Sequence, residues 1–421
     1  MSTLKERAIL VGVEEANHPQ FAYEMEELQL LAEALGVEVV GEVTQKLEHA
    51  HPSTYVGKGK VSEIKSAYNF FDANLVILND ELSPTQIRNL EYELDCKIVD
   101  RTMLILDIFA RRARTHEARM QVDLAQLQYM LPRLVGLRDS LSRQGGGTGG
   151  GFKNKGAGET KLELDRRQIE DQIAKLRREL RHAEDIRSTQ RKRRLRSGLP
   201  VVSLVGYTNA GKSTVMNGLL RAFYEEEAKE VFEKNMLFAT LDTSVRRVEL
   251  EDNKEFILTD TVGFVSKLPH HLVKAFRSTL EEARHADLLL HVVDVSHPEY
   301  RYMMEVTNET LKEVGVTDIP TLYIYNKADR TEMPYPLRKD DRLWISAKNG
   351  EGLDLLVEAV YEHIFKDYVR AEFLIPYDQG SVVSLFNEEA SVLSTEYEED
   401  GTKMLVELPI QMRDKYAQYV I

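Results

Sequence analysis

The segment Gly206–Ser213, which reads GYTNAGKS, constrains the fold of this chain more than any other part of the sequence. It matches the pattern G-x-x-x-x-G-K-[S/T], follows the apolar run Val201–Val205 and precedes the helical sequence VMNGLL. Backbone N–H groups at a helix N-terminus can surround a phosphate when the loop sits between a buried strand and a helix. The motif therefore predicts a doubly wound α/β domain, and a chance glycine turn is the alternative interpretation.

Two side chains of this loop have expected roles in chemistry. We expect Lys212 to place its charge at the β- and γ-phosphates and Ser213 to offer its hydroxyl to Mg²⁺. The glycines allow the backbone to close around the phosphates. The candidate nucleotide-binding residues here are Gly206, Tyr207, Thr208, Asn209, Ala210, Gly211, Lys212, Ser213 and Thr214.

Three further motifs each follow a predicted strand. In the segment Asp260–Gly263, after EFILT, a carboxylate can hold the Mg²⁺ shell and a glycine N–H can meet the γ-phosphate. The segment Asn326–Asp329, after LYIY, offers an aspartate that can accept hydrogen bonds from N1–H and the exocyclic amino group of guanine, a donor that adenine lacks. The segment Ser346–Lys348, after RLWI, can offer backbone N–H groups to guanine O6. The candidate residues are Asp260, Thr261, Val262, Gly263, Asn326, Lys327, Ala328, Asp329, Ser346, Ala347 and Lys348.

The segments Asp260–Gly263 and Ser346–Lys348 are weak signals alone, but the order of the four motifs along residues 206–348 resembles the translation-factor-related GTPase family. The resemblance implies binding of GTP or GDP with Mg²⁺ as the cofactor. It also implies a Mg²⁺-sensing threonine in the loop before Val245–Leu250. By similarity to the Obg-like pattern F-x-T-L we choose Thr240, with Thr243 as the alternative. The candidate residues of this loop are Phe238, Ala239, Thr240, Leu241 and Asp242.

The expected catalytic residues are Lys212, Thr240 and Gly263, and the expected metal ligands are Ser213 and Thr240. The residue after Gly263 is Phe264, where many related GTPases place a glutamine that orients the attacking water. Because phenylalanine cannot hydrogen-bond water, we expect slow intrinsic hydrolysis and a water-positioning group supplied from elsewhere, such as a partner surface.

The length of 421 residues indicates several domains, and we expect a multidomain α/β chain. Short apolar runs alternating with helical stretches predict an N-terminal α/β domain at residues 1–110. Apolar residues spaced 4, 3, 4, 3 predict an antiparallel helical hairpin at residues 111–197, with a glycine-rich loop over about 136–161. A GTP-binding domain is expected at 198–366 and a small α/β unit at 371–421. The two apolar seams are Met120, Leu124, Leu127, Leu131 and Leu134, and Ile169, Ile173, Leu176, Leu180 and Ala183.

Charge is strongly segregated along the chain. The formal net charge is −14, yet residues 166–196 hold twelve Lys or Arg against five Asp or Glu. One interpretation is a solvated helix face, and the other is a surface that contacts nucleic-acid phosphates. This segment has no aromatic residue, so recognition by base stacking is disfavoured. The acidic balance disfavours general attraction to polyanions, and we expect no DNA binding.

Segments that precede the nucleotide-binding motifs indicate more specifically which family of GTPases the chain resembles. These are His51–Lys60 (HPSTYVGKGK), Asp100–Thr102 (DRT) and Arg119–Leu134 (RMQVDLAQLQYMLPRL), followed by the glycine-rich stretch. Together they resemble the HflX family of ribosome-associated GTPases over nearly the whole chain. The resemblance implies that the N-terminal and helical regions bind the large ribosomal subunit through the rRNA backbone. It further implies separation or rescue of stalled ribosomes, especially under stress.

Other functions remain open from the sequence alone. One alternative is a regulatory GTPase that docks on a protein partner through the helical hairpin, and another is an ATP-using RNA-remodelling enzyme, which Asn326–Asp329 disfavours. The single cysteine, Cys96, cannot form an internal disulfide, and the N-terminus lacks the apolar core of a signal peptide, so we expect a cytoplasmic protein. We also expect at most peripheral membrane contact and a monomer when the protein is free.

Overall fold

The computed structural model describes residues 6–16, 18–144, 155–197, 199–223, 238, 244–250, 254–269, 272 and 283–421. The chain forms two compact units, which we call unit 1 and unit 2. Unit 1 comprises residues 1–191, 234–242 and 263–279. Unit 2 comprises residues 192–233, 243–262 and 280–421. Each unit is described by itself.

Unit 1 begins with a four-stranded parallel sheet in the order β2-β1-β3-β4. The apolar faces of β1 and β3 are buried almost completely, as expected for parallel strands covered on both sides. Ser83 caps α3 through a reciprocal capping box with Gln86, as its sequence predicts. The elements are β1 (Arg7–Glu15), α1 (Phe21–Ala34), β2 (Glu38–Leu47), α2 (Lys58–Phe70), β3 (Leu75–Leu78), α3 (Pro84–Leu94), β4 (Lys97–Asp100) and α4 (Arg101–Arg112).

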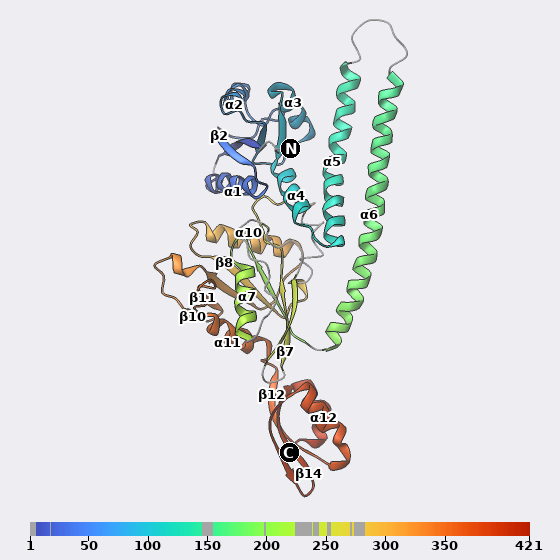
Figure 1. Ribbon diagram of the computed structural model, residues 1–421, viewed down its shortest axis with the longest axis vertical. Coiled ribbons are helices and arrows are strands. Elements are labelled where there is room, and N and C mark those ends of the chain that lie inside the picture. The colour runs from blue at the N-terminus through green and yellow to red at the C-terminus, as the bar shows by residue number, and fades with distance from the viewer. Residues whose placement is uncertain are drawn as a thin grey trace, which may run out of the picture. The chain divides into compact units, whose positions relative to one another are not determined.

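Two long helices follow, α5 (His116–Gln144) and α6 (Lys155–Ser197), and they run side by side (Figure 1). Glu117 near the start of α5 forms an ion pair of 2.7 Å with Arg187 late in α6, so the helices are antiparallel. Met120 and Ile173, one from each predicted apolar seam, are buried. The expected helical hairpin is therefore present.

The glycine-rich loop was expected over about 136–161, and that range is too wide. Helix α5 continues to Gln144, and α6 already begins at Lys155 with Gly156 and Gly158 in its first turns. A glycine in a helix costs only about 1 kcal/mol, which the long run of helix-favouring residues after Gly158 can offset. Residues 145–154 lie outside the described part of the chain.

Unit 2 is built on a seven-stranded sheet in the order β10-β11-β9-β8-β5-β7-β6. Only β10 and β6, at the two edges, run antiparallel to their neighbours. The strands are β5 (Val201–Gly206), β6 (Ser244–Glu249), β7 (Glu255–Asp260), β8 (Leu288–Asp294), β9 (Thr321–Asn326), β10 (Leu337–Lys339) and β11 (Arg342–Trp344). The helical elements are α7 (Lys212–Phe223), α10 (Tyr300–Glu313), η1 (Ala328–Arg330) and α11 (Leu353–Ile364).

Alternate residues of the central strands form one core with α7 and α11. Helix α10 packs on β5 and β8, but its buried residues Met303 and Leu311 are not part of that core. Because successive side chains of a strand point to opposite faces, α10 covers the other face of the sheet. The expected doubly wound arrangement is confirmed, and it brings the loops after β5, β7, β8 and β9 to one edge.

The C-terminal segment of unit 2 forms a three-stranded antiparallel sheet in the order β12-β14-β13. The small C-terminal α/β unit expected from the sequence is present, and its strands include Ser391–Glu398, which the sequence did not predict. Most side chains of this strand are exposed at the sheet edge, so it carries little hydrophobic signal. The elements are β12 (Tyr368–Ile375), η2 (Tyr377–Gln379), α12 (Gly380–Glu389), β13 (Ser391–Glu398), β14 (Gly401–Pro409), α13 (Ile410–Lys415) and η3 (Ala417–Tyr419).

A buried lysine joins this small sheet to the rest of unit 2. Lys254, just before β7, forms an ion pair of 2.8 Å with Glu407 of β14 and a hydrogen bond with Tyr361 of α11. Its ammonium group lies 4.4 Å from the ring centre of Tyr361, 5.3 Å from Phe365 and 5.5 Å from Tyr368. Burial raises the pKa of Glu407, but hydrogen bonds from Lys254 and Arg370 outweigh burial and hold that pKa below its usual value.

The mixed α/β fold class expected from the sequence is confirmed, whereas the domain boundaries stay predictions. Among the helices that the structure describes, none combines the length and the apolar run needed to cross a membrane.

We predict that Lys254→Met lowers the free energy of unfolding of unit 2 by about 3 kcal/mol, because Glu407 loses its buried cationic partner. Chemical denaturation followed by the fluorescence of Trp344, the only tryptophan, measures the loss. The double variant Lys254→Met/Glu407→Leu should recover at least half of it, and simple addition of two losses would contradict this account.

Candidate nucleotide-binding site

The loop between β5 and α7 has the backbone geometry of a phosphate cradle. Gly206 has φ 146°, and a Cβ there would lie 2.3 Å from the carbonyl oxygen of Val292, so only glycine fits. Val215 N–H donates to the Gly211 carbonyl at 2.9 Å and begins the hydrogen bonding of α7. Thr208 Oγ1 is buried and makes no hydrogen bond to any residue that the structure describes. The loop thus has a hydroxyl group, that of Thr208, available to a ligand, and a helix N-terminus suited to an anion.

Lys212 lies at the centre of this loop and is 7% exposed. Its ammonium group donates to the carbonyl oxygens of Gly206 at 3.0 Å and Tyr207 at 2.9 Å. Burial lowers the pKa of Lys212 to about 8, and the nearby Asp260 carboxylate partly opposes that shift. A phosphate anion in the loop would offset the desolvation of this charge.

Ser213 and Asp260 come together from α7 and the end of β7. The Ser213 hydroxyl donates to Asp260 Oδ2 at 3.0 Å, and the aspartate is fully buried. Thr261 Oγ1 donates to the Leu204 carbonyl at 2.7 Å and ties the end of β7 to β5. An oxygen pair of this kind suits a hard cation such as Mg²⁺, which commonly binds through few protein oxygens plus phosphate and water. The described residues contain no cluster of three or more His, Cys, Asp or Glu that could hold a metal without a phosphate.

Asn326, at the end of β9, connects two other loops. Its Nδ2 donates to the Ala210 carbonyl at 2.9 Å, and its Oδ1 accepts from Ala347 N–H at 3.1 Å. The side chain is 3% exposed, so both hydrogen bonds are shielded from water. The Asn326 side chain therefore fixes the position of the phosphate loop relative to the Ser346–Lys348 loop.

Lys327 adds a second connection to the phosphate loop. Its ammonium group donates to the Asn209 carbonyl at 2.8 Å and pairs with Asp294 Oδ2 at 2.7 Å. Both Asn209 and Lys327 adopt left-handed backbone conformations, with φ 60° and 62°. Asp294 was not predicted from the sequence, although its place at the end of the buried strand β8 is the same signal that identified Asp260 and Asn326.

The base-recognition candidates lie beside this connection. Asp329 is half-buried in the short helix η1 after Lys327. Ser346 and Ala347 are buried, and Lys348 is exposed. Ala328 N–H donates to the Ile345 carbonyl at 3.1 Å and holds the two loops together. The structure thus brings the motifs at 206–214, 260–262, 326–329 and 346–348 to one edge of a single sheet.

Other predicted site residues lie in unit 1 or outside the described residues. Phe238 is buried in unit 1, with its ring centre 4.5 Å from that of Phe109. Gly263 and Phe264 also belong to unit 1, and Phe264 is 1% exposed. Ala239, Thr240, Leu241 and Asp242 lie outside the described residues, as does the alternative Thr243.

The sequence also did not predict a role for a buried histidine on β8. His291 is 1% exposed, its Nδ1 has no hydrogen-bond partner among the described residues, and its ring centre lies 5.4 Å from that of Tyr323. Burial and the charge of Lys212 lower its pKa to about 4. The imidazole is therefore neutral at pH 7.

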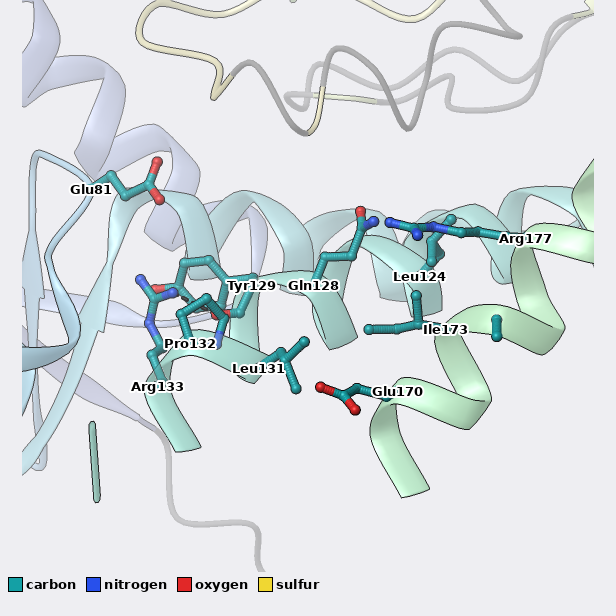
Figure 2. Close-up of a pocket in the computed structure, with 11 residues that line it drawn as sticks. Glu81, Leu124, Gln128, Tyr129, Leu131, Pro132, Arg133, Glu170, Ile173 and Arg177 are labelled. Carbon is teal, nitrogen blue, oxygen red and sulfur yellow. Dashed lines mark hydrogen bonds between the residues drawn. The ribbon is translucent and has the colours of Figure 1, made fainter. Parts of the chain in front are cut away.

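Unit 1 contains a separate cavity of about 700 Å³ between α5 and α6 (Figure 2). Arg133 on its wall stacks over the Tyr129 ring at 3.2 Å and donates to Asp100 and to the Leu82 carbonyl. None of the residues predicted to bind nucleotide lines it. The lining residues are Glu81, Leu124, Gln128, Tyr129, Leu131, Pro132, Arg133, Glu170, Ile173, Ala174 and Arg177.

Three protein-family models match consecutive parts of the chain. The model described as GTP-binding GTPase N-terminal matches residues 22–110. The model described as GTP-binding GTPase Middle Region matches residues 112–194. The model described as 50S ribosome-binding GTPase matches residues 201–327.

Similar full-length proteins are known. A protein named GTPase HflX from Caldanaerobacter subterraneus is 45% identical over 99% of this chain and 94% of its own length. GTPase HflX from Escherichia coli K12 is 40% identical over 92% of this chain and 90% of its own length. A solved GTP-binding protein from Sulfolobus solfataricus in complex with GDP is 24% identical with a TM-score of 0.45, covering 86% of this chain and 99% of that chain.

We predict that Gly211→Ala weakens GDP binding by roughly 10- to 100-fold, because strain of this kind costs about 1–3 kcal/mol. Gly211 has φ 95°, and a Cβ there would lie 2.3 Å from Asn326 Nδ2. Titration calorimetry measures the affinity. Gly315→Ala is the control, since φ is 80° and the nearest atom, in Arg284, lies at 3.9 Å. Equal losses in both variants would contradict the role of the Asn326 contact.

The lowered pKa of Lys212 predicts proton uptake on nucleotide binding. Above pH 8 much of the free protein has a neutral Lys212, and bound phosphates raise that pKa again. GDP affinity should therefore fall as the pH rises above 8, with net proton uptake on binding at pH 8.5. Calorimetry in buffers of different ionisation enthalpy measures this uptake. In Lys212→Arg, which stays charged, the uptake should vanish, and undiminished uptake would show that another group takes the proton.

Proposed function

This chain belongs to the HflX family of GTPases, and on that basis we propose that it binds the large ribosomal subunit and separates or rescues stalled ribosomes by a cycle of GTP binding and hydrolysis. The observation that carries the nucleotide part is the double hydrogen bond of Asn326, which holds the phosphate loop beside the loops expected to recognise guanine. The proposal assigns guanine recognition to Asp329, because a carboxylate left unpaired by adenine would disfavour ATP.

We assign the phosphate contacts to the loop before α7. Backbone N–H groups of residues 207–213 would face the phosphates, and Lys212 would exchange its two carbonyl contacts for phosphate oxygens. The buried pair of Ser213 and Asp260 fits Mg²⁺ beside those phosphates. When bound, Mg²⁺ neutralises charge on the β- and γ-phosphates. Thr240 is the proposed second metal ligand.

Slow intrinsic hydrolysis is part of the proposal. Phe264 stands where a water-orienting glutamine would be expected, and its side chain is buried in unit 1. A buried phenyl ring neither reaches nor hydrogen-bonds an attacking water. The missing group must then come from another residue or from a bound partner, and the ribosome is the partner we propose.

Helix α6 supports docking on RNA. Its side chains Arg167, Arg177, Arg178 and Arg181 are exposed and form no ion pair with any residue that the structure describes. By contrast, Arg166 and Lys175 of the same helix pair with glutamates four residues later. Guanidinium groups without carboxylate partners are free to contact phosphates, which favours rRNA over an apolar protein surface.

We predict that purified large ribosomal subunits raise the multiple-turnover rate of GTP hydrolysis at least about ten-fold, as expected when a partner completes the site. The stimulation should weaken between two salt concentrations, because phosphate contacts release counterions. Lys212→Ala is the control for contaminating GTPases. If subunits give no stimulation at either salt concentration, the regulatory GTPase that docks on a protein partner becomes the better account.

The same assay tests the arginines of α6. The triple variant Arg177→Glu/Arg178→Glu/Arg181→Glu should need more subunits for half-maximal stimulation and should lower the salt slope by roughly two to three. A charge-matched control reverses three exposed lysines of unit 2, Lys312, Lys339 and Lys366. If the control loses as much as the α6 variant, net charge and not this helix face determines docking.

A further inference from the structure

The seven-stranded sheet of unit 2 has a face at its β10 edge that carries aromatic and cationic side chains. Successive side chains of β9 and β11 point to opposite faces, and Leu322, Ile324 and Leu343 belong to the core formed with α7 and α11. On the opposite face, α10 packs over β5 and β8. Beyond them, over β9, β11 and β10, lies what we call the aromatic–basic face, formed by Tyr323, Tyr325, Leu337, Lys339, Arg342 and Trp344.

The strand register arranges this face in two rows. Residues opposite one another on neighbouring strands share a row, and successive rows on one face lie about 7 Å apart along the strands. A ligand that joins a flat ring to a negative charge can therefore contact both rows at once. The aromatic row is Tyr325, Trp344 and Leu337, and the basic row is Tyr323, Arg342 and Lys339.

The aromatic rings are held in place by one another. Tyr325 and Trp344 stack with ring centres 4.9 Å apart and planes 12° apart. Tyr300, at the start of α10, meets the Tyr325 ring edge-on at 6.3 Å. Tyr325 and Trp344 are half-buried, and Leu337 is 41% exposed. Because the rings are ordered without a ligand, less side-chain freedom is lost when one binds.

The cations of this face lack carboxylate partners. Arg342 and Lys339 are exposed and form no ion pair with any residue that the structure describes. Arg301 of α10 is also exposed and lies 5.7 Å from the ring centre of Tyr300. Burial raises the pKa of Tyr325, and the charges of Arg342 and Arg301 partly oppose that shift. The face is therefore locally positive in a chain of formal net charge −14, and its complementary ligand is an anion.

Single-stranded RNA fits this chemistry better than a duplex or an acidic protein. Its bases are free to contact aromatic rings, and its phosphates can contact guanidinium and ammonium groups. In a duplex the bases are stacked on one another, and the rings of this face would have no base to contact. An acidic protein segment would satisfy the cations and leave the aromatic row without a flat partner. Helix α6 has no aromatic residue, so this face supplies the contacts to bases that α6 lacks.

We propose that the aromatic–basic face is a binding surface for single-stranded RNA, with bases on the aromatic row and phosphates on the basic row. The surface belongs to unit 2 and is distinct from the arginines of α6. The inference goes beyond the proposed docking of α6 on the rRNA backbone and requires neither that docking nor GTP hydrolysis.

The fluorescence of Trp344, the only tryptophan of the chain, reports binding from within this face. The full chain is titrated with a short single-stranded RNA of mixed sequence, with a duplex of the same sequence and with a polyglutamate peptide. The single strand should quench the emission saturably, at least about ten-fold more tightly than the duplex, and its affinity should fall as salt rises. Equal binding of the duplex, or tighter binding of polyglutamate, would contradict the proposal.

Matched variants locate the site. Tyr325→Leu should weaken binding of the single strand by roughly five-fold or more, the usual effect of removing a stacking ring, whereas Tyr325→Phe keeps the ring and should bind as the wild type does. Lys339→Glu/Arg342→Glu replaces only exposed side chains and should weaken binding at least about ten-fold. The affinity for GDP, measured in each variant, shows that unit 2 is folded.

A control variant separates this face from the general effect of charge. The α6 variant Arg177→Glu/Arg178→Glu/Arg181→Glu changes the net charge more than the double reversal does and should leave the quenching of Trp344 unchanged. An equal loss in the α6 variant, or full binding by Tyr325→Leu, would overturn the proposal. Neither result bears on subunit-stimulated hydrolysis, so this inference and the proposed function fail separately.

Discussion

The amide of Asn326 is the interaction on which the nucleotide-binding candidate depends most. It satisfies one carbonyl of the phosphate loop and one N–H of the Ser346–Lys348 loop, both buried. A buried polar group without a partner is costly, so the two loops and the end of β9 must keep their relation. The same requirement explains Gly211, because any side chain there would occupy the space of that amide. The phosphate loop, the end of β9 and the Ser346–Lys348 loop are thus held together as one site.

In both units, polar groups gather at the carboxyl edge of a parallel sheet, but the partners of these groups differ. In unit 2, the loops at the carboxyl edge surround a site built for an external anion, with Lys212 desolvated and Thr208 unsatisfied within the described residues. In unit 1, the corresponding edge is occupied by Ser266 and Lys267 of the chain itself. Parallel strands direct all their carboxyl ends the same way, so polar groups gather there and need a partner. An internal segment serves as that partner in one unit, and a nucleotide is the proposed partner in the other.

The exposed and the buried cationic side chains of this protein have different roles. The chain is acidic overall, which disfavours indiscriminate contact with nucleic acid. Four exposed arginines of α6 form no ion pair within the described part of the chain, so a local surface can still contact a phosphate backbone; these are Arg167, Arg177, Arg178 and Arg181. The buried cations act differently. Arg101, Lys212 and Lys254 are each held by several partners and organise the interior.

Sequence alone determined the class of fold, the strands that precede each nucleotide motif and the family. These features depend on local patterns, namely apolar runs, glycines at fixed spacing and helix caps such as Ser83. It did not determine which residues meet across long separations. The contacts of Lys254 with Glu407 and of Arg101 with Ser266 join segments whose order in the chain carries no signal of proximity. The exposed edge strand Ser391–Glu398 was missed for a related reason, since its pairing and not its composition makes it a strand. Only the tertiary structure decided these features, because burial creates the need for each polar group to find a partner, and the fold determines which partner is within reach.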